Sequence, residues 1–157
     1  YIFKLFNDNH KLSIIFDNPI FFYNKKKQNP SNINYSIREN KWPKFPSTSC
    51  ISVRRTFINK YKKEIFIKKF SMLTVDFRLA ARSNENNSIF LKKSLTYYFQ
   101  DFSGESYKKF KTLSQNWWSR RKQAFEYLNL INNKKLLSFD YIITKFIMSF
   151  INNEKSL

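Results

Sequence analysis

The segment from residue 138 to residue 153 reads SFDYIITKFIMSFINN and carries the most regular apolar pattern of the chain. The pattern predicts an amphipathic helix that begins near Ser138, because its apolar residues recur at intervals close to 3.6. The simplest interpretation of this apolar stripe is a buried face. The alternative is contact with another protein, since its rings outnumber what a small bundle readily hides. The stripe consists of Phe139, Ile142, Ile143, Phe146, Ile147 and Phe150.

Two further helices are predicted upstream of this segment. The nearer one is long, and we expect it to end at residues 132–135, where NNKK interrupts the periodicity. Its apolar face consists of Phe110, Leu113, Trp117, Ala124, Leu128 and Ile131. The other begins after the break at Asn84–Ser88, with Ser88 as its N-cap. Its apolar positions are Leu91, Leu95, Tyr98, Phe99 and Phe102.

The region from residue 51 to residue 79 has a weaker pattern. Beyond residue 70, Val75, Phe77 and Leu79 alternate with polar residues, which favours a short strand. A continued helix is the competing interpretation. Before that, apolar residues recur with a helical spacing at Val53, Phe57, Ile58, Tyr61 and Ile65.

The first fifty residues have a different character. Ser13–Tyr23 predicts short strands around a turn at Asp17–Pro19. Asn24–Ser49 is rich in Pro, Asn, Ser and Lys, so we interpret it as an extended segment that orders on a partner. We therefore expect a mainly α fold with a small strand element, of the α+β class. An extended, basic N-terminal segment (residues 1–50) would precede a mainly helical basic domain (residues 51–157).

The charge of the chain is strongly one-sided. There are 29 Lys and Arg residues against 11 Asp and Glu, which gives a formal net charge of +18. Such a charge favours a polyanionic partner, and the pI of about 10.0 is typical of nucleic-acid-binding domains. The 18 Phe and 9 Tyr residues indicate that this is not simply the charge of a disordered tail.

Part of the composition reflects the coding sequence. Phe, Tyr, Ile, Asn and Lys, whose codons begin with two A or T bases, make up more than half of the chain. This is the imprint of a very AT-rich gene, of the kind found in organelle genomes and in some nuclear genomes. Such a bias does not account for the shortage of acidic residues, so the positive charge still requires a physical explanation.

Composition also argues against several chemistries. The single glycine, Gly104, is too few for a glycine-rich phosphate loop. With only Cys50 and His10, the chain has no internal disulfide and no Cys/His zinc site or nucleophile–base pair. We therefore expect no catalytic residue, no metal and no cofactor. No apolar run reaches the ~18–20 residues of a transmembrane helix, so no membrane span is expected.

Three basic clusters are the candidate RNA-binding residues. Lys and Arg in such clusters contact phosphates and fix position rather than read sequence. The alternative for each cluster is a solvated helix face or a flexible linker. The clusters are Lys25, Lys26 and Lys27; Arg54, Arg55, Lys60, Lys62, Lys63, Lys68 and Lys69; and Lys108, Lys109, Lys111, Arg120, Arg121 and Lys122.

The third cluster also contains adjacent tryptophans. Residues 108–122 read KKFKTLSQNWWSRRK, and in a helix Trp117 and Trp118 would lie about 100° apart around the axis. One ring could then enter the core while Trp118, beside Arg120 and Arg121, stacks on an exposed base. The alternative is that both rings are core and the cations are solvated.

The chain resembles, in composition, the proteins of organellar ribosomes of the mitochondrial type that are encoded by AT-rich genomes. The resemblance is carried by the three basic clusters and by the extended Pro/Asn/Lys segment, and it includes no motif of a particular family. It implies a structural ribosomal protein of the mitochondrial matrix that has no catalytic activity. Its cations would neutralise rRNA phosphates, and its apolar helix faces would contact neighbouring ribosomal proteins.

Two other classes of function remain open from the sequence. An accessory subunit of a respiratory or ATP-synthase complex would place its basic faces on anionic lipid or acidic subunits. An enzyme acting on RNA would need two carboxylates that converge on Mg²⁺, for which Asp76 and Asp101 are the candidates to test.

Overall fold

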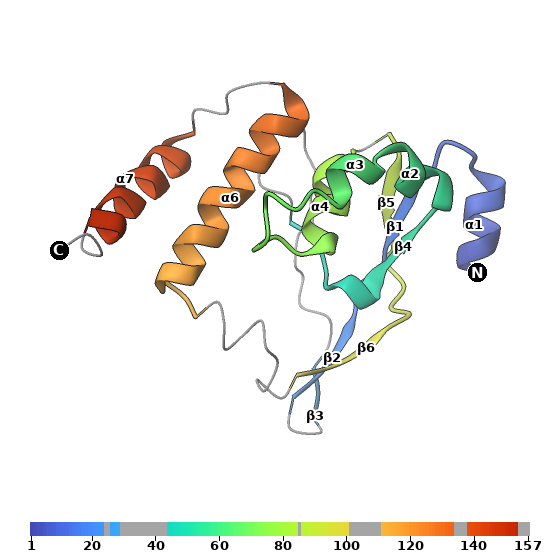
Figure 1. The fold of residues 1–157 in the computed structure, drawn as a ribbon. Coiled ribbons are helices and arrows are strands. Elements are labelled where there is room, and N and C mark those ends of the chain that lie inside the picture. The colour runs from blue at the N-terminus through green and yellow to red at the C-terminus, as the bar shows by residue number, and fades with distance from the viewer. Residues whose placement is uncertain (24–25, 29–43, 85, 101–110, 134–137, 154–157) are drawn as a thin grey trace. The chain divides into compact units, whose positions relative to one another are not determined.

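The structure is a computed structural model that describes residues 1–23, 26–28, 44–84, 86–100, 111–133 and 138–153. The chain divides into two compact units. The first unit consists of Tyr1–Ile67 and Thr74–Asp101, and the second consists of Lys68–Leu73 and Phe102–Leu157. The described residues form six α-helices and two small three-stranded sheets (Figure 1). The predicted α+β class is therefore confirmed.

The first sheet of the first unit is built around strand β1. All three residues of β1 are buried, as is usual for a central strand with an uninterrupted apolar run. β4 pairs with β1 in antiparallel orientation, and β5 pairs with it in parallel orientation. The strands are β1 (Ile14–Phe16), β4 (Ile51–Val53) and β5 (Ser88–Phe90).

The second sheet uses the continuation of two strands of the first sheet, because β2 follows β1 in the chain and β6 follows β5. β2 is central, with β3 antiparallel on one side and β6 parallel on the other. The predicted strands on either side of Asp17–Pro19 are confirmed as β1 and β2. At the break between them, Thr96 Oγ1 donates to the buried Asp17 carboxylate at 2.6 Å. The strands are β2 (Ile20–Tyr23), β3 (Lys26–Gln28) and β6 (Tyr97–Gln100).

Short helices cover the first sheet and complete the core of the first unit. Phe57 and Ile65 from α2 and α3, and Leu79 and Ala80 from α4, pack into one buried cluster with Ile14 and Phe16 of β1. These apolar positions of α2 and α3 fit the helical periodicity, whereas Val53 lies in β4. The helices are α1 (Ile2–Asp8), the 3-10 helix η1 (Thr48–Cys50), α2 (Arg55–Lys60), α3 (Lys62–Ile65) and α4 (Val75–Arg82).

The strand predicted at residues 75–79 is wrong, because this segment forms helix α4. The alternation of apolar and polar residues covers only five residues. The segment then continues into Ala80 and Ala81, which favour helix. Asp76 stabilises the first turn, where its carboxylate accepts from the Phe77 N–H at 2.7 Å.

The helix predicted at residues 88–102 is also wrong, because its residues form β5 and β6. Aromatic residues at Phe90 and Tyr97–Phe99 favour strands, and parallel pairing with β1 and β2 outweighs the helical spacing. Ser88 is the first residue of β5 rather than an N-cap. Phe102, at the end of that predicted helix, lies outside the described residues, as do residues 29–43 of the predicted extended segment.

The second unit contains the two long helices α6 (Gln115–Asn132) and α7 (Phe139–Asn153). The predicted end of α6 is confirmed, since Asn133 adopts a left-handed conformation with φ 50° that terminates the helix. Its predicted start is wrong. Ser114 caps the helix by accepting from the Trp117 N–H at 3.2 Å, and Leu113 before it has φ 64°. Phe110 lies outside the described residues.

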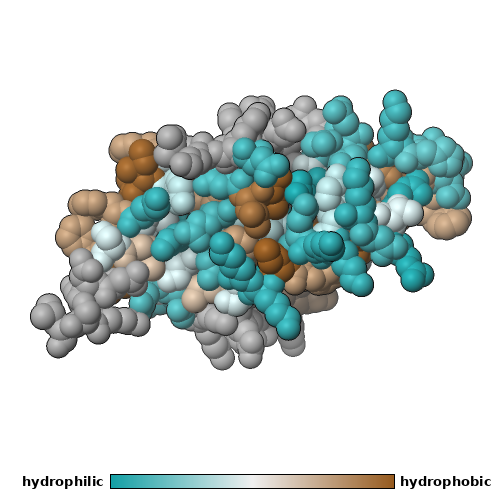
Figure 2. Space-filling view, turned by 45° about the horizontal axis from the view of Figure 1, so that its top comes forward, coloured by the Kyte–Doolittle hydropathy of each residue, from teal (hydrophilic) through white to brown (hydrophobic). Residues whose placement is uncertain are grey.

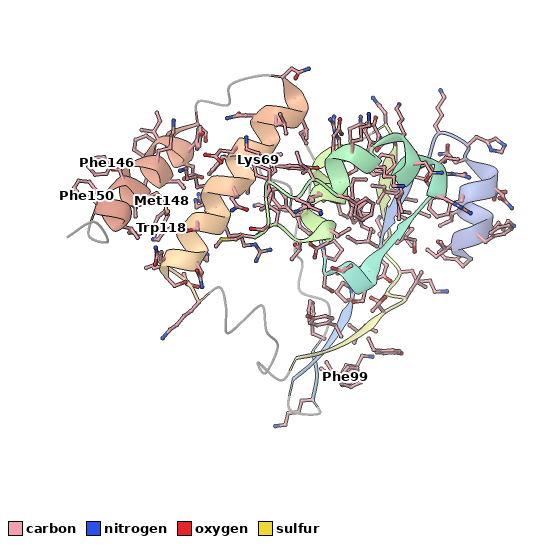
Figure 3. The ribbon with its side chains drawn as sticks, viewed as in Figure 1. Lys69, Phe99, Trp118, Phe146, Met148 and Phe150 are labelled. Atoms are coloured by element: carbon pink, nitrogen blue, oxygen red, sulfur yellow. The ribbon has the colours of Figure 1, made fainter. Side chains whose placement is uncertain are left out.

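The prediction of α7 is confirmed, but the interpretation of its stripe as a buried face is wrong. Tyr141, Thr144 and Met148 are the buried residues of α7, and they line the face that packs on α6. The polar Thr144 made this series look less apolar than the neighbouring one. Figure 3 shows Phe146 and Phe150 on the side of α7 away from α6. The exposed stripe consists of Phe139, Ile142, Phe146 and Phe150.

Candidate nucleic-acid interface

The exposed side of α2 and α3 carries the densest group of cations in the first unit. Phe57 and Ile65 turn toward the core and Ile58 packs against it, which leaves the Lys and Arg side chains of these short helices at the surface. In Figure 2, which keeps the left-to-right order of Figure 1, hydrophilic side chains dominate the part where α1, α2 and α3 lie. We call Arg55, Lys60, Lys62 and Lys63, all of them exposed, the α2–α3 basic surface.

The positive charge of this surface is not neutralised within the described part of the chain. The one acidic residue of these two helices, Glu64, forms an ion pair with Arg82 of α4 instead. None of the four cations forms an ion pair with any described residue. Lys60 Nζ lies 5.2 Å from the centre of the Tyr61 ring. This cation–π contact keeps the charge of Lys60 near the junction between α2 and α3. The surface can therefore offer four charges to an anion.

Arg54, the neighbour of Arg55, has a different position. Its Nε donates to the Leu12 carbonyl at 2.6 Å, and its Nη2 donates to the carbonyls of Phe6 and Asn9. The guanidinium also lies 4.9 Å from the centre of the Phe6 ring. Because α1 contributes no buried side chain, Arg54 is a main attachment of α1 to the rest of the unit.

The two adjacent arginines provide a matched test. We expect Arg54→Met to lower the free energy of unfolding by about 2–3 kcal/mol, because it removes charge-assisted hydrogen bonds from the guanidinium to three backbone carbonyls. Arg55→Met should change it by less than about 0.5 kcal/mol, because Arg55 is exposed. Urea denaturation followed by circular dichroism measures both. Arg54→Lys should remain destabilised, since an ammonium cannot form the fork of donors. Equal destabilisation by the two Met variants would contradict this assignment.

The other predicted cations of the first two clusters are found in separate places. Lys26 and Lys27 are exposed on β3, and Lys25 lies outside the described residues. Lys68 and Lys69 are exposed, but they belong to the second unit. Lys69 Nζ lies 5.5 Å from the centre of the Phe70 ring, and Figure 3 labels Lys69. Among the described cations of these two clusters, Arg55, Lys60, Lys62 and Lys63 therefore share the adjacent helices α2 and α3, and the others lie on different elements.

The third predicted cluster does not form one helix face. Lys111 is exposed and precedes α6, and Lys108 and Lys109 lie outside the described residues. Arg120 is half-buried on α6. Lys122, also half-buried, has its Nζ 3.9 Å from a carboxylate oxygen of Glu126, which is a weak helical pair.

Arg121 connects the two helices of the second unit. Its guanidinium lies 2.9 Å from the Asp140 carboxylate and 3.2 Å from Thr144 Oγ1. It also packs against the rings of Trp117 and Phe125, at 5.4 and 5.5 Å from their centres. These contacts give Arg121 a structural role between α6 and α7.

Trp118 is half-buried rather than fully exposed. Its ring meets that of Trp117 edge to face, with the ring centres 4.7 Å apart. Figure 3 shows it on the side of α6 that faces α7. Exposed aromatic rings are found elsewhere, at Tyr97 and Phe99 of β6, which the sequence pattern had assigned to a helix. The signal for them was the run of strand-forming aromatic residues YYF at residues 97–99.

The candidate carboxylate Asp76 is engaged in the fold. Asp76, one of the two candidates for a magnesium site, accepts from Thr48 Oγ1 at 2.8 Å and from the Phe77 N–H. Asp101, the other candidate, lies outside the described residues. Within the described part of the chain, no group of three or more His, Cys, Asp and Glu side chains could hold a metal ion.

Cys50 is buried at the end of η1, and its environment suppresses the thiolate. Burial raises the pKa of its thiol above the ordinary value of 9.0, and the charge of Asp17 raises it further, against hydrogen bonds from Ser47, Ser49 and Thr96. Because the folded pKa lies above the unfolded one, the stability that Cys50 contributes is fully present below pH 9 and is lost at higher pH.

We expect native Cys50 to react with iodoacetamide at pH 8 at least about a hundredfold more slowly than in 8 M urea, because reaction requires local opening. Mass spectrometry of the alkylated chain over time measures both rates. A native rate within a few-fold of the rate in urea would show that the thiol is accessible.

No protein-family model, curated protein or solved structure matches the chain. Within the described residues, no helix combines the length and apolar character that crossing a membrane requires. The candidate interface therefore rests on the geometry of the side chains themselves.

Proposed function

We propose that this protein is a structural constituent of an organellar ribosome, of the mitochondrial type, that binds rRNA. The observation that carries the proposal is the α2–α3 basic surface, where four exposed cations have no ion-pair partner among the described residues. Phosphate oxygens are the natural ligands of such a surface, and the net charge of +18 favours a polyanion over an isolated anionic site. The proposed location is the mitochondrial matrix.

The proposed role is architectural. Lys and Arg on the short helices α2 and α3 would follow the phosphate backbone, so binding would depend on the shape of the RNA and on salt concentration. The exposed stripe of α7, which comprises Phe139, Ile142, Phe146 and Phe150, would contact a neighbouring ribosomal protein. This division of roles requires no catalytic residue, metal or cofactor.

Sedimentation of a native organelle lysate tests the proposal. The lysate is separated on a density gradient at low and high salt, and the chain is followed by mass spectrometry. We expect it to migrate with rRNA at low salt and to leave that fraction after ribonuclease treatment. Migration that does not change after ribonuclease treatment would contradict a ribosomal function.

One observation favours a second candidate, an accessory subunit of a respiratory or ATP-synthase complex. The stripe on α7 exposes four large apolar side chains, with Phe139 77% and Phe146 63% exposed. Such a face could lie against a membrane surface or an apolar subunit. In the same gradient, this candidate predicts migration with a detergent-solubilised membrane complex, indifferent to ribonuclease.

A further inference from the structure

The second sheet of the first unit has an aromatic face, which is separate from the α2–α3 basic surface. Across the sheet, Phe22 of β2 is paired with Phe99 of β6 on one side and with Lys27 of β3 on the other. Directly paired residues lie on the same face of a sheet, so these three side chains form one row. Tyr97, two residues before Phe99, lies on that face as well.

The rings on this face are in mutual contact. Phe22 and Phe99 are stacked, with centres 5.0 Å apart and planes inclined by 24°. Phe22 and Tyr97 have centres 5.7 Å apart. We call Phe22, Tyr97, Phe99 and Lys27 the aromatic face.

The outer rings of the aromatic face are open to solvent. Phe99 is 72% exposed and Tyr97 is 62% exposed, whereas Tyr98 between them is half-buried and meets Phe21 on the opposite face. Strands with one exposed face usually carry polar residues there. An aromatic pair in that position therefore points to a ligand surface. Figure 3 shows Phe99 projecting outward from β6.

The charge around the aromatic face selects the ligand. Strands β2, β3 and β6 contain no acidic residue, and Lys27, the lysine of β3 on this face, is exposed. Flat rings beside a lysine match an unpaired base and its phosphate, because every base has a π-face that can stack on an aromatic side chain. A duplex keeps its bases stacked inside, so it could not use these rings.

We propose that the aromatic face binds unpaired bases of single-stranded RNA, with Phe99 and Tyr97 as stacking platforms and Lys27 as a phosphate contact. The inference rests on the proposed function in that the partner is RNA, but it assigns a second surface with a different task. The α2–α3 basic surface would hold phosphates of structured RNA, and the aromatic face would capture a loop or an unpaired end.

The test compares two RNA probes on the full-length chain by fluorescence anisotropy. One probe is a labelled 12-nucleotide oligouridine, which has no paired bases, and the other is a labelled 16-base-pair RNA duplex. The variants are Phe99→Leu and Tyr97→Leu, which keep an apolar side chain but remove the flat ring. Phe3→Leu on α1 is the control, since Phe3 is as exposed as Phe99 but lies outside the aromatic face.

We expect each ring substitution to weaken oligouridine binding about tenfold and to leave duplex binding within twofold. The slope of log K against log salt should not change for the ring variants, because no charge is removed. Lys27→Gln should instead reduce the oligouridine slope by about 0.7, the value of one phosphate contact on a single strand. Phe3→Leu should change neither affinity, and a circular dichroism spectrum identical to that of the original chain shows that each variant is folded.

The outcomes separate this inference from the proposed function. Oligouridine binding that survives both ring substitutions within twofold, with duplex binding intact, would overturn the inference alone. An equal loss of affinity for both probes in the ring variants would also overturn the inference, because stacking on unpaired bases could not explain weaker binding of the duplex. Failure of the original chain to bind either RNA would overturn both proposals.

Discussion

Replacing Phe70 with Ala is expected to destabilise the second unit by about 3–5 kcal/mol, which is the usual cost of emptying a buried phenyl site. Phe70 is 1% exposed, and its ring meets the fully buried Tyr127 of α6 edge to face, with ring centres 5.5 Å apart. The same segment is held by a hydrogen bond of 3.0 Å from the Met72 N–H to Gln123 Oε1. Phe70 therefore links the short segment Lys68–Leu73 to a helix some fifty residues later.

Hydrogen exchange with mass spectrometry locates the effect of the substitution. In Phe70→Ala, peptides from α6 should lose protection, while peptides from β1 and β4 should keep it, because those strands belong to the first unit. Phe66→Ala is the matched control. Phe66 is 52% exposed, so its removal should change the free energy of unfolding by less than about 0.5 kcal/mol. Loss of protection at β1 equal to that at α6 would show that Phe70 belongs to the core of the first unit instead.

The sequence predicted the long helices better than the short elements. α7 and the C-terminal part of α6 follow from apolar periodicity sustained over many residues, and Asn133 supplies a recognisable stop. The start of α6 was missed because Leu113 fits the periodicity but has positive φ, so the helix begins only after the Ser114 cap. Periodicity also did not show which face of α7 is buried, because the choice depends on contacts of Thr144 with Arg121.

β5 and β6 were missed for a different reason. Their apolar positions fit a helical spacing, and only their parallel partners β1 and β2, more than seventy residues earlier in the chain, make them strands. Such non-local pairing leaves little trace in a short window of sequence. The aromatic face was hidden by the same error, since Phe99 was assigned to the apolar side of a helix.

The candidate site was predicted in part. The cations of α2 and α3 are visible as a basic cluster, and the structure leaves four of them exposed. The sequence does not show that Arg54 and Arg55 have different roles. The carbonyls that accept hydrogen bonds from Arg54 belong to residues 42 to 48 positions away. The same applies to Arg121, whose partners Asp140 and Thr144 lie on the next helix.

The largest expected effect on binding concerns the α2–α3 basic surface. Replacing Arg55, Lys60, Lys62 and Lys63 together with Gln should weaken duplex RNA binding about a thousandfold at 0.15 M salt. The estimate follows from counterion release, since four phosphate contacts at a slope of about −0.9 each amount to roughly three decades at this ionic strength. The slope of log K against log salt should fall by about 3.6 for the same reason. The melting temperature should change little, because all four side chains are exposed.

A charge-matched variant separates a defined surface from diffuse attraction. Lys4, Lys11, Lys44 and Lys92 are also exposed cations of the first unit, and replacing these four with Gln removes the same net charge. If α2 and α3 form the interface, this control should lose far less affinity and should keep most of the salt slope. If the two variants lose affinity equally, the RNA senses only the net charge of the chain, and the assignment of the interface to α2 and α3 is wrong. The comparison decides between these cases because long-range attraction depends on total charge, whereas counterion release at a contact depends on which phosphates are neutralised.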